Sequence, residues 1–216
     1  MDDARRKEWD TLLSFDRAVR QIVTLVNTLK LTGNTVIIYM TDKGSPTGEH
    51  RWTDKVCAYD ECTRTPLIVK YRSGNQGYSL PQIVGNEDIA PTIADLAGIT
   101  PPAPVDGQSF APFLRTGRAP AGWKDEALIR VYNGANDRPG KGHPPTAWAI
   151  RTRNYEYIET VGTGEVELYD LRVDPYELHS VAGKLAYAAR QAGLAGQLAR
   201  LRSAPPRSSV RNGAKR

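Results

Sequence analysis

The chain has 216 residues, of which 40% are hydrophobic and 25% charged, and its formal net charge is +5. This composition is ordinary for a soluble globular protein of one large domain or two small ones. No apolar run is long enough to span a membrane, and the amino-terminal segment has no apolar signal-peptide core. These features exclude a membrane-spanning protein and lead us to expect a cytoplasmic one.

The positive charge is concentrated at the carboxyl terminus. All 24 acidic residues lie at or before Glu177, whereas eight of the 29 basic residues follow it. No aromatic residue follows Tyr187, so this basic segment lacks the stacking groups of many nucleic-acid-binding proteins. We interpret it as a solvated tail and expect no nucleic-acid partner.

The amino-terminal part of the chain predicts a helix followed by a strand. Apolar residues recur at three- and four-residue steps between residues 4 and 30, which is typical of an amphipathic helix. Residues 35–40 form a short apolar, β-branched run, which favours a strand buried on both faces, as in a parallel sheet. Asp42 comes at the end of this strand, where open α/β sheets bind ligands. Lys55 follows thirteen residues later, so a carboxylate and an ammonium could share one site.

The two cysteines, Cys57 and Cys62, are separated by five positions. On a helix this spacing does not place both side chains on one face, and two thiols do not form a metal cage. We therefore interpret them as a pair of partly buried thiols. The segment that contains them, residues 56–62, is expected to form a short helical turn.

The next segments predict a second strand and a second helix. Residues 66–71 predict another buried strand, with proline at its first position. Asp88 and Gly98 are the expected N-cap and stop of a helix. Residues 116–124 are rich in Gly, Pro and Ala, which indicates a boundary.

Beyond this boundary the pattern changes to the alternation of strands. Four strands are expected at residues 127–132, 148–152, 155–160 and 166–171. Tyr155 and Tyr157 share one face of their strand, with Glu156 on the other. We expect a small antiparallel sheet covered by a helix at about residues 185–201.

Several motifs along the chain carry a family resemblance. T-D-x-G, G-E-H-x-W-x-D-K and T-R-x-P-L-I-V occur in this order between residues 41 and 69. D-I-A-P-T-I-A-D-L-A-G-I, D-G-x-S-F-x-P-F-L, W-A-I-R-T-R-N-Y-E-Y-I and E-L-Y-D-L-R-V-D-P-Y-E-L-H-S-V-A follow. Together they resemble the sulfatase family of the alkaline-phosphatase superfamily over residues 10–201. The resemblance implies an α/β fold, namely the carboxyl-terminal part of a mostly parallel sheet with flanking helices, plus a small antiparallel α+β subdomain.

The resemblance also suggests how the chain is divided. We expect the following parts: the carboxyl-terminal half of the α/β domain at 1–116, a linker at 117–124, the small subdomain with its terminal helix at 125–202, and a disordered basic tail at 203–216. A sheet cut after its first strands exposes an edge and one bare face. A complementing chain or a dimer is therefore expected to cover it.

The family's site residues fall on specific positions of this sequence. In sulfatases the motif aspartate ligates a divalent metal, usually Ca²⁺, and the lysine thirteen residues on contacts the sulfate. The resemblance implies that Asp42 is the metal ligand and that Lys55 and His50 are catalytic residues, with His50 in the weaker role near the pocket. Lys43 occupies the position usually held by Asn or His. A charged lysine has no lone pair and repels a cation, which argues against metal binding in this chain.

The family's nucleophile is a formylglycine made from the first residue of C/S-x-P-x-R. Neither cysteine lies in such a motif, and the single literal match, residues 203–207, falls in the basic tail, outside the expected context. The amino-terminal aspartate pair of the family's metal site is also absent from this sequence. We therefore predict that the complete protein hydrolyses a small-molecule or glycan sulfate ester and that this chain alone is inactive.

Two alternatives stay open. The first is a phosphonate or phosphate ester hydrolase of the same superfamily, which uses a similar site. The second is a degenerate, non-catalytic binding module, which Lys43 favours. Among the other polar residues, Arg64 is expected to form a structural salt bridge, His143 to lie in an exposed loop and His179 to be structural.

Overall fold

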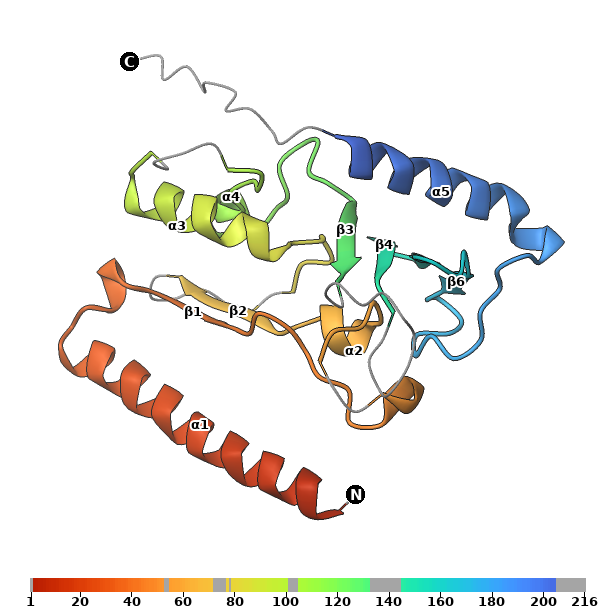
Figure 1. The fold of residues 1–216 in the computed structure, drawn as a ribbon. Coiled ribbons are helices and arrows are strands. Elements are labelled where there is room, and N and C mark those ends of the chain that lie inside the picture. Colours follow the sequence, from red (N-terminus) through yellow and green to blue (C-terminus); the bar gives the residue numbers. More distant parts are fainter. Residues whose placement is uncertain are drawn as a thin grey trace. The chain divides into compact units, whose positions relative to one another are not determined.

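The structure, a computed structural model, describes residues 2–52, 55–71, 77, 79–100, 105–132 and 145–204. The chain divides into two compact units, whose elements are drawn in Figure 1. The first unit comprises Met1–Met40 and Leu67–Gly77, and the second comprises Thr41–Pro66 and Tyr78–Arg216. The linker predicted at 117–124 lies within the second unit.

The first unit contains one long helix and a two-stranded antiparallel sheet. It comprises the helix α1 (Asp2–Thr28), a short 3-10 turn (Thr32–Asn34), β1 (Val36–Met40) and β2 (Leu67–Tyr71). The predicted helix is confirmed, and its Phe15 packs edge-on against Tyr39 of β1 with ring centroids 5.9 Å apart. Other apolar side chains of α1 are more than half exposed, namely Trp9, Leu12, Leu13, Ile22 and Leu25.

The expectation for β1 needs a correction. Every residue of β1 is half-buried rather than buried on both faces, and β2 alternates between half-buried and exposed residues. The two strands pair antiparallel, with Val36 opposite Tyr71 and Met40 opposite Leu67. The prediction of a parallel, fully buried strand was wrong because Val, Ile and Tyr suit any pleated strand with one covered face. A short apolar run therefore does not determine the pairing direction.

The second unit begins with short helices and ends with a four-stranded sheet and a long helix. Its helical elements are the 3-10 turn Glu49–Arg51, α2 (Asp60–Thr63), the 3-10 turn Asn86–Asp88, α3 (Ile89–Ala97), α4 (Ala111–Thr116), the 3-10 turn Leu185–Tyr187 and α5 (Ala188–Ser203). Its strands are β3 (Glu126–Val131), β4 (Ala147–Thr152), β5 (Tyr155–Thr160) and β6 (Val166–Asp170). All neighbouring strands pair antiparallel in the order β3-β4-β5-β6, as predicted.

The small sheet has a different core on each face. On one face the buried residues Ile150, Tyr155, Tyr157 and Leu168 pack against α5 through Leu194 and Leu198. Figure 1 shows α5 lying along this sheet. On the other face Ala58, from the segment before α2, packs with Val131, Ala147, Ala149, Ile158 and Tyr169. The predicted alternation of Tyr155 and Tyr157 against Glu156, together with the covering helix, is confirmed, because strand periodicity is a local property of the sequence.

Asp88 precedes α3, as expected of an N-cap residue, but its side chain connects several segments instead of capping the helix. Its carboxylate is fully buried and accepts hydrogen bonds from the backbone N–H groups of Gly85 and Gln108, both at 2.8 Å. Lys124 Nζ lies 2.7 Å from Asp88 Oδ2. The expected stop of α3 is confirmed at Gly98, whose φ of 71° favours glycine.

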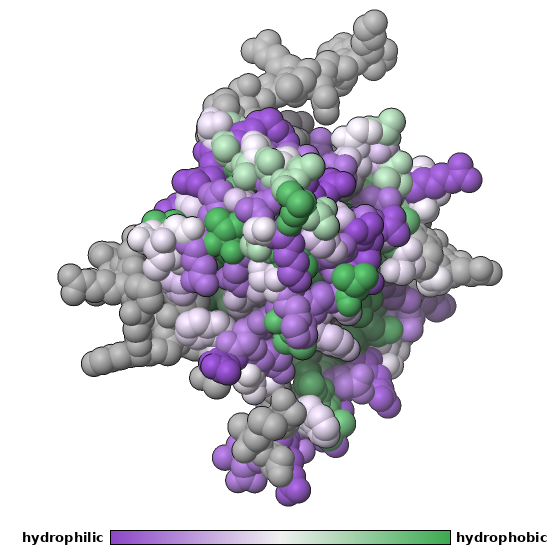
Figure 2. All heavy atoms as spheres, turned by 90° about the vertical axis from the view of Figure 1, so that its right-hand side faces the viewer, coloured by the Kyte–Doolittle hydropathy of each residue, from purple (hydrophilic) through white to green (hydrophobic). Residues whose placement is uncertain are grey.

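The surface of the molecule is mainly polar where Figure 2 shows it, with hydrophobic side chains in separate patches. Among the described helices, none combines the length and the apolar character needed to cross a membrane.

The buried ion pair of Lys124 and Asp88 yields a stability prediction. Lys124→Met leaves a fully buried carboxylate without its cation, and we expect a loss of about 3–5 kcal/mol in the free energy of unfolding. Urea unfolding monitored by circular dichroism measures this loss. Lys184→Met, at an exposed position, serves as the control and should change stability by less than about 0.5 kcal/mol. Equal stabilities of the two variants would contradict the assignment.

Candidate functional site

The loop after β1 carries the T-D-x-G motif. Thr41 Oγ1 donates a hydrogen bond to the carbonyl oxygen of Lys43 at 3.1 Å, and Asn86 Nδ2 donates to the carbonyl of Asp42 at 2.8 Å. The side chains of Asp42 and Lys43 are both exposed. The loop is thus held through its backbone, which leaves the Asp42 carboxylate accessible.

Gly44 explains why this motif needs a glycine. Its N–H donates to the carbonyl of Cys62 at 2.8 Å, so the loop lies directly against α2. A Cβ atom at position 44 would lie 1.8 Å from the carbonyl oxygen of Glu61. Any side chain here would therefore force the Asp42 loop away from α2.

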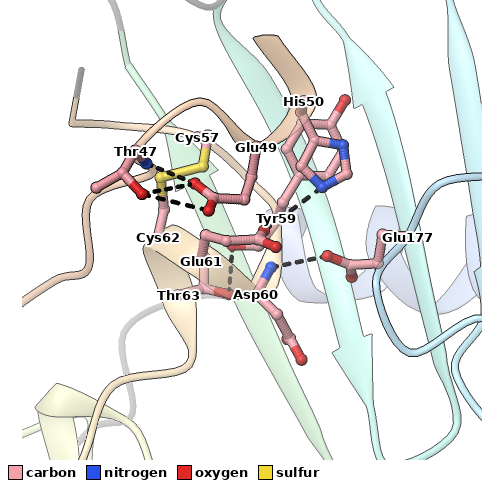
Figure 3. Close-up of a disulfide and its surroundings, with 10 residues drawn as sticks. All are labelled: Thr47, Glu49, His50, Cys57, Tyr59, Asp60, Glu61, Cys62, Thr63 and Glu177. Atoms are coloured by element: carbon pink, nitrogen blue, oxygen red, sulfur yellow. Dashed lines mark hydrogen bonds and ion pairs between the residues drawn. A yellow bond between two sulfur atoms is a disulfide. The ribbon is translucent and has the colours of Figure 1, made fainter. Parts of the chain in front are cut away.

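The G-E-H motif forms a tight left-handed turn that positions His50. Gly48, His50 and Arg51 have φ values of 125°, 50° and 63°. The Glu49 carboxylate accepts hydrogen bonds from the backbone N–H and the hydroxyl of Thr47, as Figure 3 shows. Gly48 supplies a backbone conformation that other residues adopt only at a cost, and the turn directs His50 inward.

The imidazole of His50 lies inside the protein, with only 9% of its side chain exposed. It stacks on the ring of Tyr59, with centroids 3.8 Å apart and planes 10° apart (Figure 3). Its Nε2 lies 3.4 Å from Glu61 Oε2, an ion-pair distance without the angles of a hydrogen bond. Tyr59 in turn donates to Glu167 at 3.0 Å, and burial together with that carboxylate raises the pKa of Tyr59.

Cys57 and Cys62 form a disulfide, so the interpretation as a pair of thiols was wrong (Figure 3). The expected helical turn at 56–62 is also shorter than predicted. Helix α2 begins only at Asp60, and Val56 has a φ of 80°. Because Cys57 lies in an irregular segment, the chain can bend and bring the two Cα atoms within 5.5 Å, a distance that suits a disulfide.

A cluster of acidic residues lies beneath this loop. Asp60 receives two hydrogen bonds from Arg151 of β4, from Nε and a terminal nitrogen, both at 3.0 Å. Arg151 Nε also lies 3.3 Å from Glu156 on β5. Glu177 Oε2 accepts a hydrogen bond from the backbone N–H of Asp60 at 2.8 Å. The cluster therefore ties α2 to the small sheet.

The two glutamates of this cluster are almost completely buried, with 0% and 1% exposed for Glu156 and Glu177. Burial raises the pKa of Glu156 well above its usual value, and the negative charge of Glu177 adds to the effect. Burial also raises the pKa of Glu177, although hydrogen bonds from Glu156 and from the backbone of Asp60 oppose it. The pair consequently favours one shared proton over two full negative charges.

The remaining candidate residues are placed as follows. The predicted salt bridge of Arg64 is confirmed, because its guanidinium lies 3.7 Å from Asp60, although the arginine side chain is 78% exposed. Lys55 is exposed. His179 is exposed, and its backbone N–H donates to Asp174. His143 and most of the literal C/S-x-P-x-R match at 203–207 lie outside the described residues.

The donor set around Asp42 does not by itself suit Ca²⁺. This ion takes about six to eight oxygen ligands, several of them carboxylates. Within the described ranges, the groups of His, Cys, Asp and Glu close enough to hold an ion are His50 with Glu61 and Glu177, and Asp60 with Glu156 and Glu177. Neither group includes Asp42. The predicted role of Asp42 as a metal ligand therefore stays a prediction.

Sequence reasoning missed Asp60, Arg151, Glu156 and Glu177. One signal was available, because Arg151 and Glu156 occupy strand positions on the same face as the buried Ala149 and Ile158. Charged residues at inward-facing strand positions indicate a buried polar network. The contribution of Glu177, which comes from a loop, left no such pattern.

Comparison with known proteins agrees with the motifs and the topology. Residues 48–204 match the family model described as N-sulphoglucosamine sulphohydrolase, C-terminal. This chain belongs to the sulfatase family. Sulfatases form part of the alkaline-phosphatase superfamily and generally use a divalent metal ion. The match covers the carboxyl-terminal region, as the resemblance implied.

Curated sulfatases are similar over most of the chain. An N-acetylglucosamine-6-O-sulfatase from Bacteroides thetaiotaomicron is 34% identical over 184 residues, which cover 84% of this chain and 32% of the relative. The human N-acetylglucosamine-6-sulfatase is 36% identical over 139 residues, covering 62% of this chain and 24% of the relative. The chain thus spans about a third or less of the length of these sulfatases.

Solved structures confirm the α/β fold class. A structure in complex with its substrate D-glucosamine-2-N,6-O-disulfate superposes with a TM-score of 0.78 at 31% identity, covering 88% of this chain and 38% of the other. The phosphonate monoester hydrolase of Agrobacterium radiobacter gives a TM-score of 0.71 at 27% identity, covering 87% and 38%. Both sulfatase and phosphonate hydrolase chemistry therefore occur among proteins with this fold.

The close approach at Gly44 yields a mutational prediction. In Gly44→Ala the new Cβ would collide with the backbone carbonyl of Glu61, so we expect a loss of about 3 kcal/mol or more in the free energy of unfolding. Gly33→Ala is the matched control, because no atom lies within 4 Å of its Cβ position. Urea unfolding compares the two variants. A Gly44→Ala protein as stable as Gly33→Ala would refute the close contact.

The raised pKa of Glu156 yields a pH prediction. A carboxyl group whose pKa is higher in the folded state stabilises the protein fully below its unfolded pKa of about 4.3 and loses this contribution as the pH rises through the folded pKa. Glu156→Gln is neutral at every pH. We therefore expect it to lose less stability than the unsubstituted protein as the pH rises above about 4.3.

Urea unfolding at several pH values measures the stability of both proteins. The buffer contains EDTA, so that no metal ion bound to the acidic residues changes the pH dependence. Glu165→Gln, an exposed acid-to-amide change, should keep the original pH dependence. If Glu156→Gln and the unsubstituted protein show the same slope of stability against pH, Glu156 does not hold a proton in the folded state.

Proposed function

We propose that this chain forms the carboxyl-terminal part of a hydrolase that cleaves sulfate esters on amino-sugar substrates. The observation that carries the proposal is the 34% identity, over 84% of the chain, with an N-acetylglucosamine-6-O-sulfatase. The similarity to a structure holding D-glucosamine-2-N,6-O-disulfate supports the same substrate class. Because the chain spans about a third of such relatives, the activity belongs to a protein with the remaining part of the fold.

The roles of the individual residues follow from their chemistry. Lys55 carries an ammonium group that can offset the negative charge of a sulfate ester and the charge that develops as the ester bond breaks. Asp42 offers an accessible carboxylate on a loop fixed by its backbone contacts, which suits one ligand of the family's divalent metal. His50 is buried against Tyr59, so it would act by holding the loop that carries Lys55.

Inactivity of the isolated chain is part of this proposal. The two cysteines are joined in the disulfide, so neither is available as a precursor of formylglycine. Lys43 adds a positive charge beside Asp42, where a cation would bind. A non-catalytic binding module remains the alternative that this lysine favours, and the phosphonate hydrolase of similar fold supports a second alternative chemistry.

Turnover assays test the proposal. The purified chain, supplied with Ca²⁺, should not hydrolyse 4-nitrophenyl sulfate or N-acetylglucosamine 6-sulfate. Co-expression with the amino-terminal two-thirds of the Bacteroides relative, as a separate chain, should give a complex with sulfatase activity. Lys55→Ala should lower that activity by about 100-fold or more, because it removes a group that stabilises the transition state.

The other outcomes separate the alternatives. Activity of the isolated chain that disappears in Asp42→Ala would overturn the predicted inactivity but support the sulfatase function. Cleavage of an aryl phosphonate ester in preference to the sulfates would favour the phosphonate hydrolase. A complex that forms on gel filtration but turns over none of these substrates would contradict the hydrolase function.

A further inference from the structure

Three atoms of the kind that bind metals meet beneath the loop that carries Lys55. His50, Glu61 and Glu177 each offer one ligand atom, and these atoms lie within 4.8 Å of one another. His50 Nε2, Glu61 Oε2 and Glu177 Oε1 are shielded from solvent, and within the described part of the chain none of them has a hydrogen-bond partner. Buried polar atoms are nearly always hydrogen-bonded, and here His50 Nε2 and Glu61 Oε2 have only their 3.4 Å contact with each other, so three such ligand atoms in one place require an explanation.

The surrounding charges favour a cation. The carboxylates of Asp60, Glu61, Glu156 and Glu177 converge here, and the buried cation that faces them in the described structure is Arg151, which is already paired with Asp60 and Glu156. Uncompensated negative charge in a buried site is costly.

The spacing and the donor types suit a zinc-like ion. Ligands at the zinc distances of about 2.0–2.2 Å in a tetrahedral arrangement lie roughly 3.3 Å apart, and His50 Nε2 lies 3.4 Å from Glu61 Oε2. The Glu177 oxygen would need to move by less than about 2 Å to reach the same spacing from both atoms. One imidazole with two carboxylates is a zinc-type donor set, whereas Ca²⁺ prefers oxygen ligands alone.

From this geometry we infer that His50, Glu61 and Glu177 bind a divalent transition-metal ion of the zinc type, at a site separate from the one to which Asp42 contributes. The ligands are already oriented by neighbouring groups, as metal ligands usually are. Tyr59 stacks on the imidazole, and the N–H of Asp60 holds the second oxygen of Glu177 (Figure 3).

The ion would fix the segment between its ligands. His50 and Glu61 lie at the two ends of the segment that contains Lys55, and Glu177 follows β6 in the small subdomain. A bound ion would therefore join both ends of this segment to the small sheet. Its role is structural, so the inference holds whether or not the protein hydrolyses sulfate esters.

Metal binding to the purified chain, free of any affinity tag, tests the inference. After treatment with EDTA and then Zn²⁺, the protein should keep one equivalent of zinc through gel filtration, as measured by mass spectrometry of the metal content. Co²⁺ in place of zinc should give the visible absorption of a tetrahedral or five-coordinate site. Zinc should also raise the Tm, because it binds the folded chain.

Isosteric variants identify the ligands. Glu61→Gln and Glu177→Gln should each weaken zinc binding by about tenfold or more, since even partners of metal ligands contribute that much. Glu165→Gln and Asp42→Asn should bind zinc like the unsubstituted protein. In Glu177→Gln the amide oxygen can still accept from Asp60, and circular dichroism checks that each variant is folded.

Two results would overturn the inference. The first is an unsubstituted protein that retains no zinc, which would mean that protons alone balance the buried charge. The second is equal zinc binding by folded Glu61→Gln, folded Glu177→Gln and the unsubstituted protein, which would place the ion elsewhere.

Discussion

The pairing of Arg151 with Asp60 is the interaction on which the candidate site depends. Asp60 is the first residue of α2, and Arg151 holds its carboxylate from the middle of the four-stranded sheet with two hydrogen bonds. Helix α2 in turn supplies the Cys62 carbonyl that binds the N–H of Gly44. The position of the loop that presents Asp42 therefore depends on an ion pair between α2 and β4, whose Arg151 lies far from Asp42 in the sequence.

Elements set by local periodicity could be predicted from the sequence. The long first helix, the four antiparallel strands and the covering helix α5 all follow from 3.6-residue or two-residue repeats, and Gly98 ends α3 as glycines often do. The pairing of β1 with β2 could not be predicted, because the same apolar residues fit a parallel or an antiparallel neighbour. The disulfide depended on an irregular backbone before α2, which residue spacing alone does not reveal.

The candidate site was predictable only where a family motif marks it. Asp42, His50 and Lys55 were singled out in this way, and their roles stay predictions. The structure adds that His50 is turned inward, against Tyr59, by a left-handed turn at Gly48. The buried acids behind it are joined across long sequence separations, as between Asp60 and Glu177. Such contacts arise from the packing of the sheet against α2, which no single segment encodes.

The disulfide has a consequence for how the protein is made. These 216 residues contain two cysteines, so only one intramolecular disulfide can form among them. Formation of this bond requires an oxidant. In the reducing cytosol the two cysteines would stay as thiols, whereas export to an oxidising compartment would allow the disulfide to form. The oxidation state of this one bond would therefore report the compartment in which the chain matured.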